Sequence, residues 1–232
     1  EIDKKKFLNL NFESFYENLS NNKILLIKDI DSLDIFTQFF RSIGQTRTHP
    51  ASAFGHNDYK DVLMIGNVNS GNNKSLETAV GTYHIDYAYL EKPDIATALL
   101  AIKPDKQATT IYKCLNEFAT KVIAYLNQIN VKHSDLKVVH DYRYFYENYA
   151  KDRDISSINF NKIPPVKKNL FYFHPITGEI KINFSRETCR EILLNDKPNV
   201  ELKNVIDGLL DESNIIHEHK YDENSILVWD NL

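Results

Sequence analysis

Residues 81–90 read Gly-Thr-Tyr-His-Ile-Asp-Tyr-Ala-Tyr-Leu, and His84 and Asp86 are the most chemically distinctive pair in this stretch. In a β-strand, residues i and i+2 point to the same face of the sheet. A strand here would project His84 and Asp86 together while Ile85 packs against the opposite side. A neutral imidazole beside a carboxylate supplies two of the three protein ligands in the two-histidine, one-carboxylate arrangement that binds non-haem Fe(II).

The same H-x-D spacing occurs twice more, at His56-Asn-Asp58 and at His133-Ser-Asp135. The first string follows a glycine in a polar stretch. The second follows a predicted helix, where Ser and Asp are typical of a turn. We interpret both as turn or cap residues, because so short a motif often matches by chance. The residues around His84 must therefore decide whether its motif differs from the other two.

The residues before this pair predict two helices and one strand. Apolar side chains recur at helical spacing over residues 11–19 and again over 33–43. Ser32 is a candidate N-cap for the second helix, and Gly44 ends its pattern. Between the two helices, the apolar run 23–28 has the length of a strand.

The rest of the chain predicts short strands with few helices. Residues 67–77 form a polar loop between the strand candidates 62–65 and 96–102. Helical spacing is clear over 115–129 and 200–210. Further strand candidates are 136–140, 170–173, 179–183, 215–221 and 226–229. This pattern favours an α+β, mainly β, fold: a sandwich or jelly roll with flanking helices.

The composition excludes several classes of protein. The chain has 232 residues, enough for one domain or two small ones, and its net charge of −4 argues against a nucleic-acid partner. Its two cysteines form no C-x-x-C motif, and no apolar run reaches the ~18 residues of a membrane span. No leader-like segment opens the chain, so we expect a cytoplasmic protein. The motifs GxGxxG, GxxxxGK[ST], GxSxG and HExxH are absent from the sequence.

Five parts of the sequence, taken in order, resemble a known enzyme family. They are 23–29 with 39–44, Arg47-Thr-His-Pro50, 83–90 followed by Pro93, 174–183, and 225–231. Together they resemble the taurine dioxygenase and clavaminate-synthase-like family of Fe(II)/2-oxoglutarate-dependent dioxygenases. The resemblance covers most of the chain.

The resemblance implies a double-stranded β-helix (jelly-roll) core with flanking helices, in a single oxygenase domain over residues 1–232 that lacks its C-terminal segment. It makes His84 and Asp86 the first two iron ligands. It assigns the distal carboxylate of 2-oxoglutarate to the hydroxyl of Thr110 or of its neighbour Thr109. The third ligand, a histidine, and an arginine for the same carboxylate are expected beyond Leu232. O2 is the other co-substrate.

The resemblance also suggests residues for a small-molecule substrate. His49 stands where some family members contact an anionic substrate group, and Asn67 enters the polar loop. Tyr87 and Tyr89 alternate with the ligand pair and are candidates for the pocket wall. For each of these four residues, ordinary loop or packing roles remain the alternative.

We therefore expect an Fe(II)/2-oxoglutarate-dependent oxygenase that hydroxylates or otherwise oxidises a small molecule, with decarboxylation of 2-oxoglutarate to succinate and CO2. One alternative is a non-catalytic relative that acts as a binding or scaffold protein. Another is a different metal enzyme that uses His84 and Asp86 with some other donor. His217 and His219 face the same way on a predicted strand, and we interpret them as strand residues of a polar face. No membrane or nucleic-acid partner is expected, and a homo-oligomer remains open.

Overall fold

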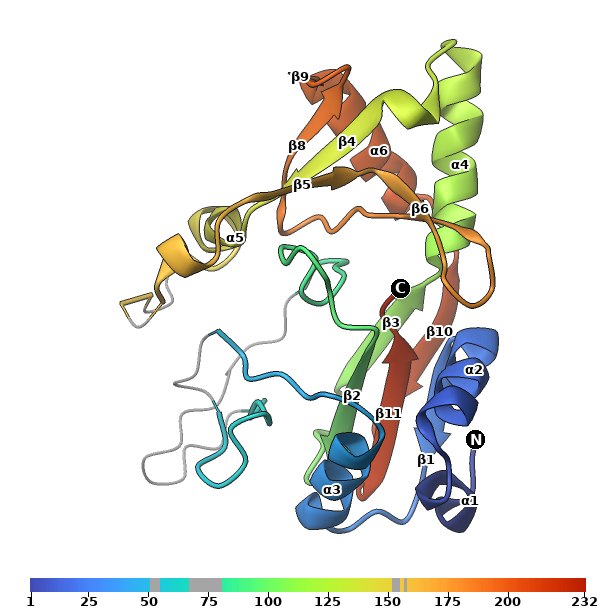
Figure 1. The fold of residues 1–232 in the computed structure, drawn as a ribbon, viewed down its shortest axis with the longest axis vertical. Coiled ribbons are helices and arrows are strands. Elements are labelled where there is room, and N and C mark those ends of the chain that lie inside the picture. The colour runs from blue at the N-terminus through green and yellow to red at the C-terminus, as the bar shows by residue number, and fades with distance from the viewer. Residues whose placement is uncertain (51–54, 67–80, 152–154, 157) are drawn as a thin grey trace.

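The computed structural model describes residues 1–50, 55–66, 81–151, 155–156 and 158–232. Strands β1, β11 and β2 form one sheet, and β10 and β3 form a pair beside it (Figure 1). The sheet β5-β4-β8-β9 and the hairpin β6-β7 make up the other half of the molecule. All pairings within these sheets are antiparallel.

The first half begins with three helices, α1 (Lys4–Leu8), α2 (Phe12–Asn22) and α3 (Leu33–Ile43). The side chain of Asn11 caps α2, and Ser32 caps α3 by accepting from the Ile35 N–H at 3.3 Å. Both predicted N-terminal helices are therefore confirmed. Their apolar faces cover one side of the sheet formed by β1 (Ile24–Ile27), β11 (Ser225–Asp230) and β2 (Ala96–Ala101).

Alternation along β11 decides which of its side chains meet these helices. Ile226 and Val228 belong to the core that contains the helices, so Leu227 and Trp229 face the opposite side of the sheet. Trp229 lies directly across from Thr97 of β2. That second face looks toward β3 (Thr109–Lys113) and β10 (Ile215–Lys220), because the rings of Trp229 and Tyr112 lie 5.7 Å apart.

In the other half, helices α4 (Leu115–Gln128) and α6 (Val200–Asp211) pack on β4 (Leu136–His140), β8 (Cys189–Leu194) and the hairpin of β6 (Phe171–Phe173) and β7 (Ile180–Ile182). Strands β5 (Val166–Asn169) and β9 (Lys197–Pro198) lie at the edges of this sheet. Within the described part of the chain, no helix is long and apolar enough to cross a membrane.

Some elements differ from the sequence predictions. Residues 62–65 do not form a strand: within the described part of the chain, Leu63 makes an isolated bridge with Gly55 and no ladder. The sequence analysis did not identify β3, β5, β8 or the helix α5 (Tyr142–Asn148). These segments lack a clean polar/apolar period, and pairing or packing with distant residues fixes their structure.

His140, at the end of β4, is a buried histidine in a structural role. Its Nε2–H donates to the Asn183 carbonyl at 3.2 Å, and its Nδ1 accepts from the Thr188 hydroxyl at 3.0 Å. Burial lowers the pKa of His140 to about 3, and the positive charge of Lys168 adds to this effect. The folded protein therefore holds this imidazole neutral.

The buried His140 predicts acid-dependent stability. Between the unfolded pKa of about 6.5 and the folded pKa of about 3, the unfolded chain binds the extra proton, so stability falls as the pH falls. We expect His140→Gln, which cannot titrate, to reduce the slope of the unfolding free energy by about 1.4 kcal/mol per pH unit between pH 6 and 4. Urea denaturation at a series of pH values measures both slopes, and equal slopes would contradict this role.

Candidate active site

The segment that carries His84 and Asp86 is not a strand, and this corrects the local prediction. Residues 83–85 have no regular secondary structure and 86–89 form a turn, with Tyr87 at a φ of 56°. The two side chains nevertheless meet, because His84 Nε2 lies 3.4 Å from Asp86 Oδ1. The turn, and not a pleated strand, brings them together.

Residues far away in the sequence hold this irregular segment in place. The Ile85 N–H donates to the Ser185 hydroxyl at 3.1 Å, and the Arg186 N–H donates to the Tyr83 carbonyl at 3.3 Å. The Asn231 side chain accepts from the Asp86 N–H at 3.0 Å and donates to the Asp86 carbonyl at 2.8 Å. The backbone of the candidate ligand segment is thereby fixed from both sides.

The imidazole of His84 is oriented by the backbone. Nδ1 lies 3.0 Å from the Thr82 carbonyl, to which it donates, and this leaves Nε2 directed at Asp86. Burial opposes a charge on His84, but the hydrogen bond to Asp86 and the carboxylate of Glu187 outweigh it and raise the pKa to about 10. A carbonyl that fixes one ring nitrogen and frees the other is the usual outer support of a metal-bound histidine.

The carboxylate of Asp86 is held as an anion. Burial acts to raise its pKa, but hydrogen bonds from His84 and Thr97 and the charge of His49 bring the pKa below the ordinary value. An ionised carboxylate beside an imidazole is a suitable pair of donors for a divalent cation. In the regions that the structure describes, no group of three or more His, Cys, Asp and Glu residues is arranged to hold a metal, so the pair would need a further ligand from elsewhere.

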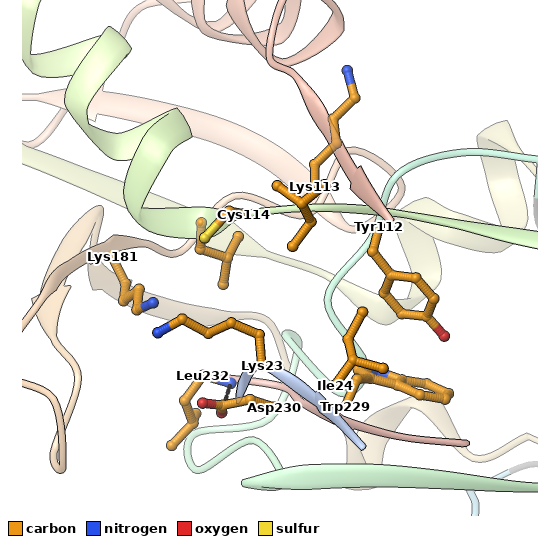
Figure 2. Close-up of a pocket in the computed structure, with 11 residues that line it drawn as sticks. Lys23, Ile24, Tyr112, Lys113, Cys114, Lys181, Trp229, Asp230 and Leu232 are labelled. Atoms are coloured by element: carbon orange, nitrogen blue, oxygen red, sulfur yellow. Dashed lines mark hydrogen bonds between the residues drawn. The ribbon is translucent and has the colours of Figure 1, made fainter. Parts of the chain in front are cut away.

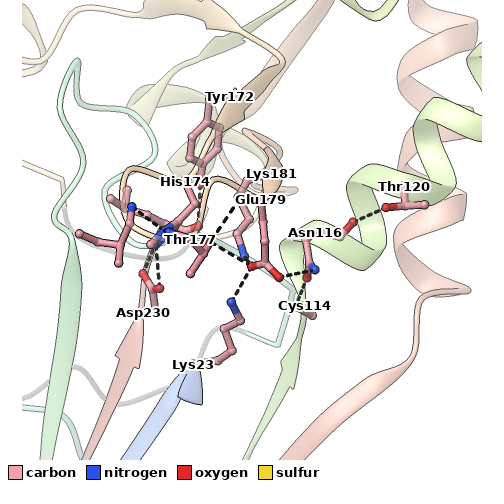
Figure 3. Close-up of polar contacts among 12 residues, drawn as sticks. Lys23, Cys114, Asn116, Thr120, Tyr172, His174, Thr177, Glu179, Lys181 and Asp230 are labelled. Atoms are coloured by element: carbon pink, nitrogen blue, oxygen red, sulfur yellow. Dashed lines mark hydrogen bonds and ion pairs between the residues drawn. The ribbon is translucent and has the colours of Figure 1, made fainter. Parts of the chain in front are cut away.

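The end of β11 is fixed by a buried hydrogen bond between His174 and Asp230. His174 Nε2 donates to Asp230 Oδ2 at 2.9 Å, while its Nδ1 accepts from the N–H groups of Ile176 and Thr177 (Figure 3). The Tyr172 hydroxyl donates to the Leu232 carbonyl at 2.8 Å. These contacts place Asn231 where it meets Asp86.

A second polar group near β11 joins the two halves of the molecule. The Nζ atoms of Lys23 and Lys181 lie 2.6 Å and 3.0 Å from the same oxygen of Glu179 (Figure 3). Both lysines also line a pocket with Tyr112 and Trp229 (Figure 2).

The two candidate threonines lie on opposite faces of β3. Thr110 is partly buried, and its hydroxyl oxygen lies 2.6 Å from the Tyr221 hydroxyl oxygen. Thr109 is exposed on the other face. Thr110 shares its face with Tyr112, whose ring contacts Trp229, so the geometry favours Thr110 over Thr109 for an interior ligand.

The candidate substrate residues separate into two groups. The rings of His49 and Tyr87 lie 5.7 Å apart. Both residues lie near the site, and His49 helps to lower the pKa of Asp86. Tyr89 is buried and stacks on Tyr142 at 4.1 Å within an aromatic cluster, so it packs against the core instead. Asn67 lies outside the described residues.

The other H-x-D strings serve local structure. His56 Nδ1 accepts from the N–H groups of Asp58 and Tyr59, and His133 and Asp135 lie in one turn of 3₁₀ helix. His217 and His219 lie on β10 with ring centroids 5.7 Å apart and face the same way, as expected.

The sequence analysis did not identify the contacts of Asn231 with Asp86. Its side chain makes three hydrogen bonds, to the Asp86 N–H, the Asp86 carbonyl and the Asp94 carbonyl. The position of Asn231 just after an apolar strand is the only feature of the sequence that points to a structural role. The sequence does not show which distant residues it contacts.

Asn231→Ala should leave three partly buried backbone groups without their partner. We expect the unfolding free energy to fall by about 1–3 kcal/mol and the affinity of the His84–Asp86 pair for a divalent metal to fall at least tenfold. Urea denaturation and metal titration measure the two effects. Asn214→Ala, at an exposed site that contacts Glu117, is the matched control and should change neither quantity appreciably. An unchanged metal affinity in Asn231→Ala would contradict the positioning role.

Comparisons with known proteins identify the family of the chain. The family model described as taurine catabolism dioxygenase TauD, TfdA family matches residues 1–232. No curated protein sequence matches the chain.

Three solved structures share the fold. A taurine dioxygenase from Burkholderia xenovorans is 17% identical, with a TM-score of 0.67, over 100% of this chain and 72% of that one. A protein from the same organism, assigned as an alpha-ketoglutarate-dependent taurine dioxygenase, is 16% identical, with a TM-score of 0.70, over 100% and 75%. AAD-2 in complex with Mn(II) and N-oxalylglycine is 15% identical, with a TM-score of 0.66, over 100% and 82%. The chain therefore belongs to the TauD, TfdA family and is an Fe(II)- and 2-oxoglutarate-dependent dioxygenase that uses O2.

Proposed function

We propose that this enzyme hydroxylates or otherwise oxidises a small molecule, with decarboxylation of 2-oxoglutarate to succinate and CO2, at a metal held by His84 and Asp86. The observation that carries the proposal is the convergence of His84 Nε2 and Asp86 Oδ1, 3.4 Å apart, with Nδ1 fixed by the Thr82 carbonyl. Imidazole and carboxylate are the donor types that suit Fe(II), so the residues fit the metal. When bound, the iron and its co-substrates supply the oxidising chemistry.

The protein contributes orientation and charge. Asn231 fixes the backbone of Asp86, Thr97 orients its carboxylate, and Thr82 orients His84. The proton shared between His84 and Asp86 must leave before a cation binds, because a metal needs the neutral imidazole. His49 and Tyr87 lie where a substrate group could contact them, and the charge of His49 suits an anionic group.

We further propose that the two sheets of the first half and the β5-β4-β8-β9 sheet belong to a jelly-roll core in a single oxygenase domain. The mixed helix and strand content and the fold shared with the three solved structures support this arrangement. A further histidine for the metal and an arginine for the 2-oxoglutarate carboxylate are the groups that the proposed sites still need. Arginine is the expected partner because its planar fork matches a carboxylate bidentately.

An anaerobic titration tests the site. The whole protein with Fe(II) and 2-oxoglutarate should show the visible metal-to-ligand charge-transfer band, and Asp86→Ala should abolish it, because the carboxylate ligand is lost. Asp135→Ala, in an H-x-D string that serves a local turn, is the matched control and should keep the band.

A band that persists in Asp86→Ala would show that Asp86 is not a ligand. A whole protein that gives no band, and binds neither iron nor 2-oxoglutarate, would favour the non-catalytic alternative instead.

A further inference from the structure

The strand pair β3–β10 places five polar side chains on one face. Thr110 lies directly across from His219, and Tyr112 lies directly across from His217. Directly opposed residues share a face of the sheet, and Tyr221 follows His219 at the next position of that face. The hydroxyl contact between Tyr221 and Thr110, at 2.6 Å, confirms that they meet.

This polar face looks toward Asp86. The ring of Tyr112 lies 5.7 Å from that of Trp229, and Trp229 is paired across β11 and β2 with Thr97, which hydrogen bonds to Asp86. Burial raises the pKa of the Tyr112 phenol, and the nearby charges, Asp86 among them, raise it further. Tyr112 therefore lies between the candidate metal site and the Thr110–His219 pair.

One polar atom of this face is buried without a hydrogen bond. His219 is only 6% exposed, and its Nε2 has no hydrogen-bond partner among the residues that the structure describes. The Tyr112 hydroxyl, in contrast, interacts with the Tyr221 phenol. Buried polar groups are normally paired, and an exception calls for an explanation such as a ligand or ordered water.

The chemistry of the face suits a carboxylate. It offers an imidazole nitrogen and hydroxyl groups, all able to donate, and its own strands place no carboxylate on it; Glu218 points to the opposite side. The charges that act on His219 are those of His217 and Asp222.

We infer that His219 contacts the distal carboxylate of 2-oxoglutarate, beside Thr110, the residue to which the family resemblance assigns that carboxylate. This inference rests on the proposed function, because it takes the other end of the co-substrate to lie at the His84–Asp86 pair. His219 donates through Nε2, and the carboxylate accepts. His219 is thus a co-substrate-binding residue that the sequence motifs do not assign.

The test compares two ligands that differ only at the distal end. Anaerobic calorimetry of the whole protein with Fe(II) measures the affinity for 2-oxoglutarate, and competition measures that for 2-oxopentanoate, which has an uncharged tail. His219→Phe should weaken 2-oxoglutarate binding at least tenfold, as expected for a lost hydrogen bond to a charged group, and leave 2-oxopentanoate binding within twofold.

Two further substitutions keep the test decisive if His219→Phe folds poorly. His219→Gln places an amide donor near the Nε2 position and should retain most of the affinity for 2-oxoglutarate. His219→Asn places the amide near the Nδ1 position and should behave like His219→Phe. His217→Phe, on the same face but exposed, is the matched control and should bind both ligands nearly as well as the unmodified protein.

The outcomes separate this inference from the proposed function. Equal losses for both ligands, or equal affinities in the Gln and Asn variants, would overturn the inference and leave a structural or water-binding role for His219. An unmodified protein that binds neither ligand in the presence of Fe(II) would overturn the proposed function, and this inference with it.

Discussion

The three hydrogen bonds from the Asn231 side chain to Asp86 and Asp94 are the contact on which the candidate site depends. Residues 83–89 have no sheet or helix to pair their backbone groups, and buried backbone groups need partners. Asn231 supplies them from the end of β11, which the His174–Asp230 pair fixes in turn. The geometry of the ligand pair therefore depends on contacts with both halves of the molecule.

The four longer helices, α2, α3, α4 and α6, and most central strands could be predicted because their signals are local. Caps at Asn11 and Ser32 and a helical apolar period are enough for α2 and α3. Strand β3 reads Thr-Thr-Ile-Tyr-Lys, with polar groups on both faces, and only its pairing with β10 makes it a strand. The opposite error occurred at 62–65, where, among the residues that the structure describes, the apolar run makes only an isolated bridge between Leu63 and Gly55.

The site was only partly predictable for the same physical reason. His84 and Asp86 were expected to meet on a strand, and they meet through a turn, so the juxtaposition was right and its cause was wrong. Family resemblance singled out this H-x-D string, whereas the strings at His56 and His133 have the same spacing and serve turns. The contacts of Asn231, Ser185 and Thr97 join residues far apart in sequence, and no local pattern contains them.

The arrangement of the cores explains where a polar interior can be tolerated. Helices α1–α3 cover one face of the β1–β11–β2 sheet, and α4 and α6 cover the other half of the molecule (Figure 1). These two apolar cores provide the burial that stabilises the fold. The opposite face of β11 packs toward β3 and β10, with no helix between them. His219, Tyr112 and Thr110 therefore lie outside the two apolar cores. The unpaired Nε2 of His219 lowers the stability of the folded protein. A bound carboxylate would offset that loss.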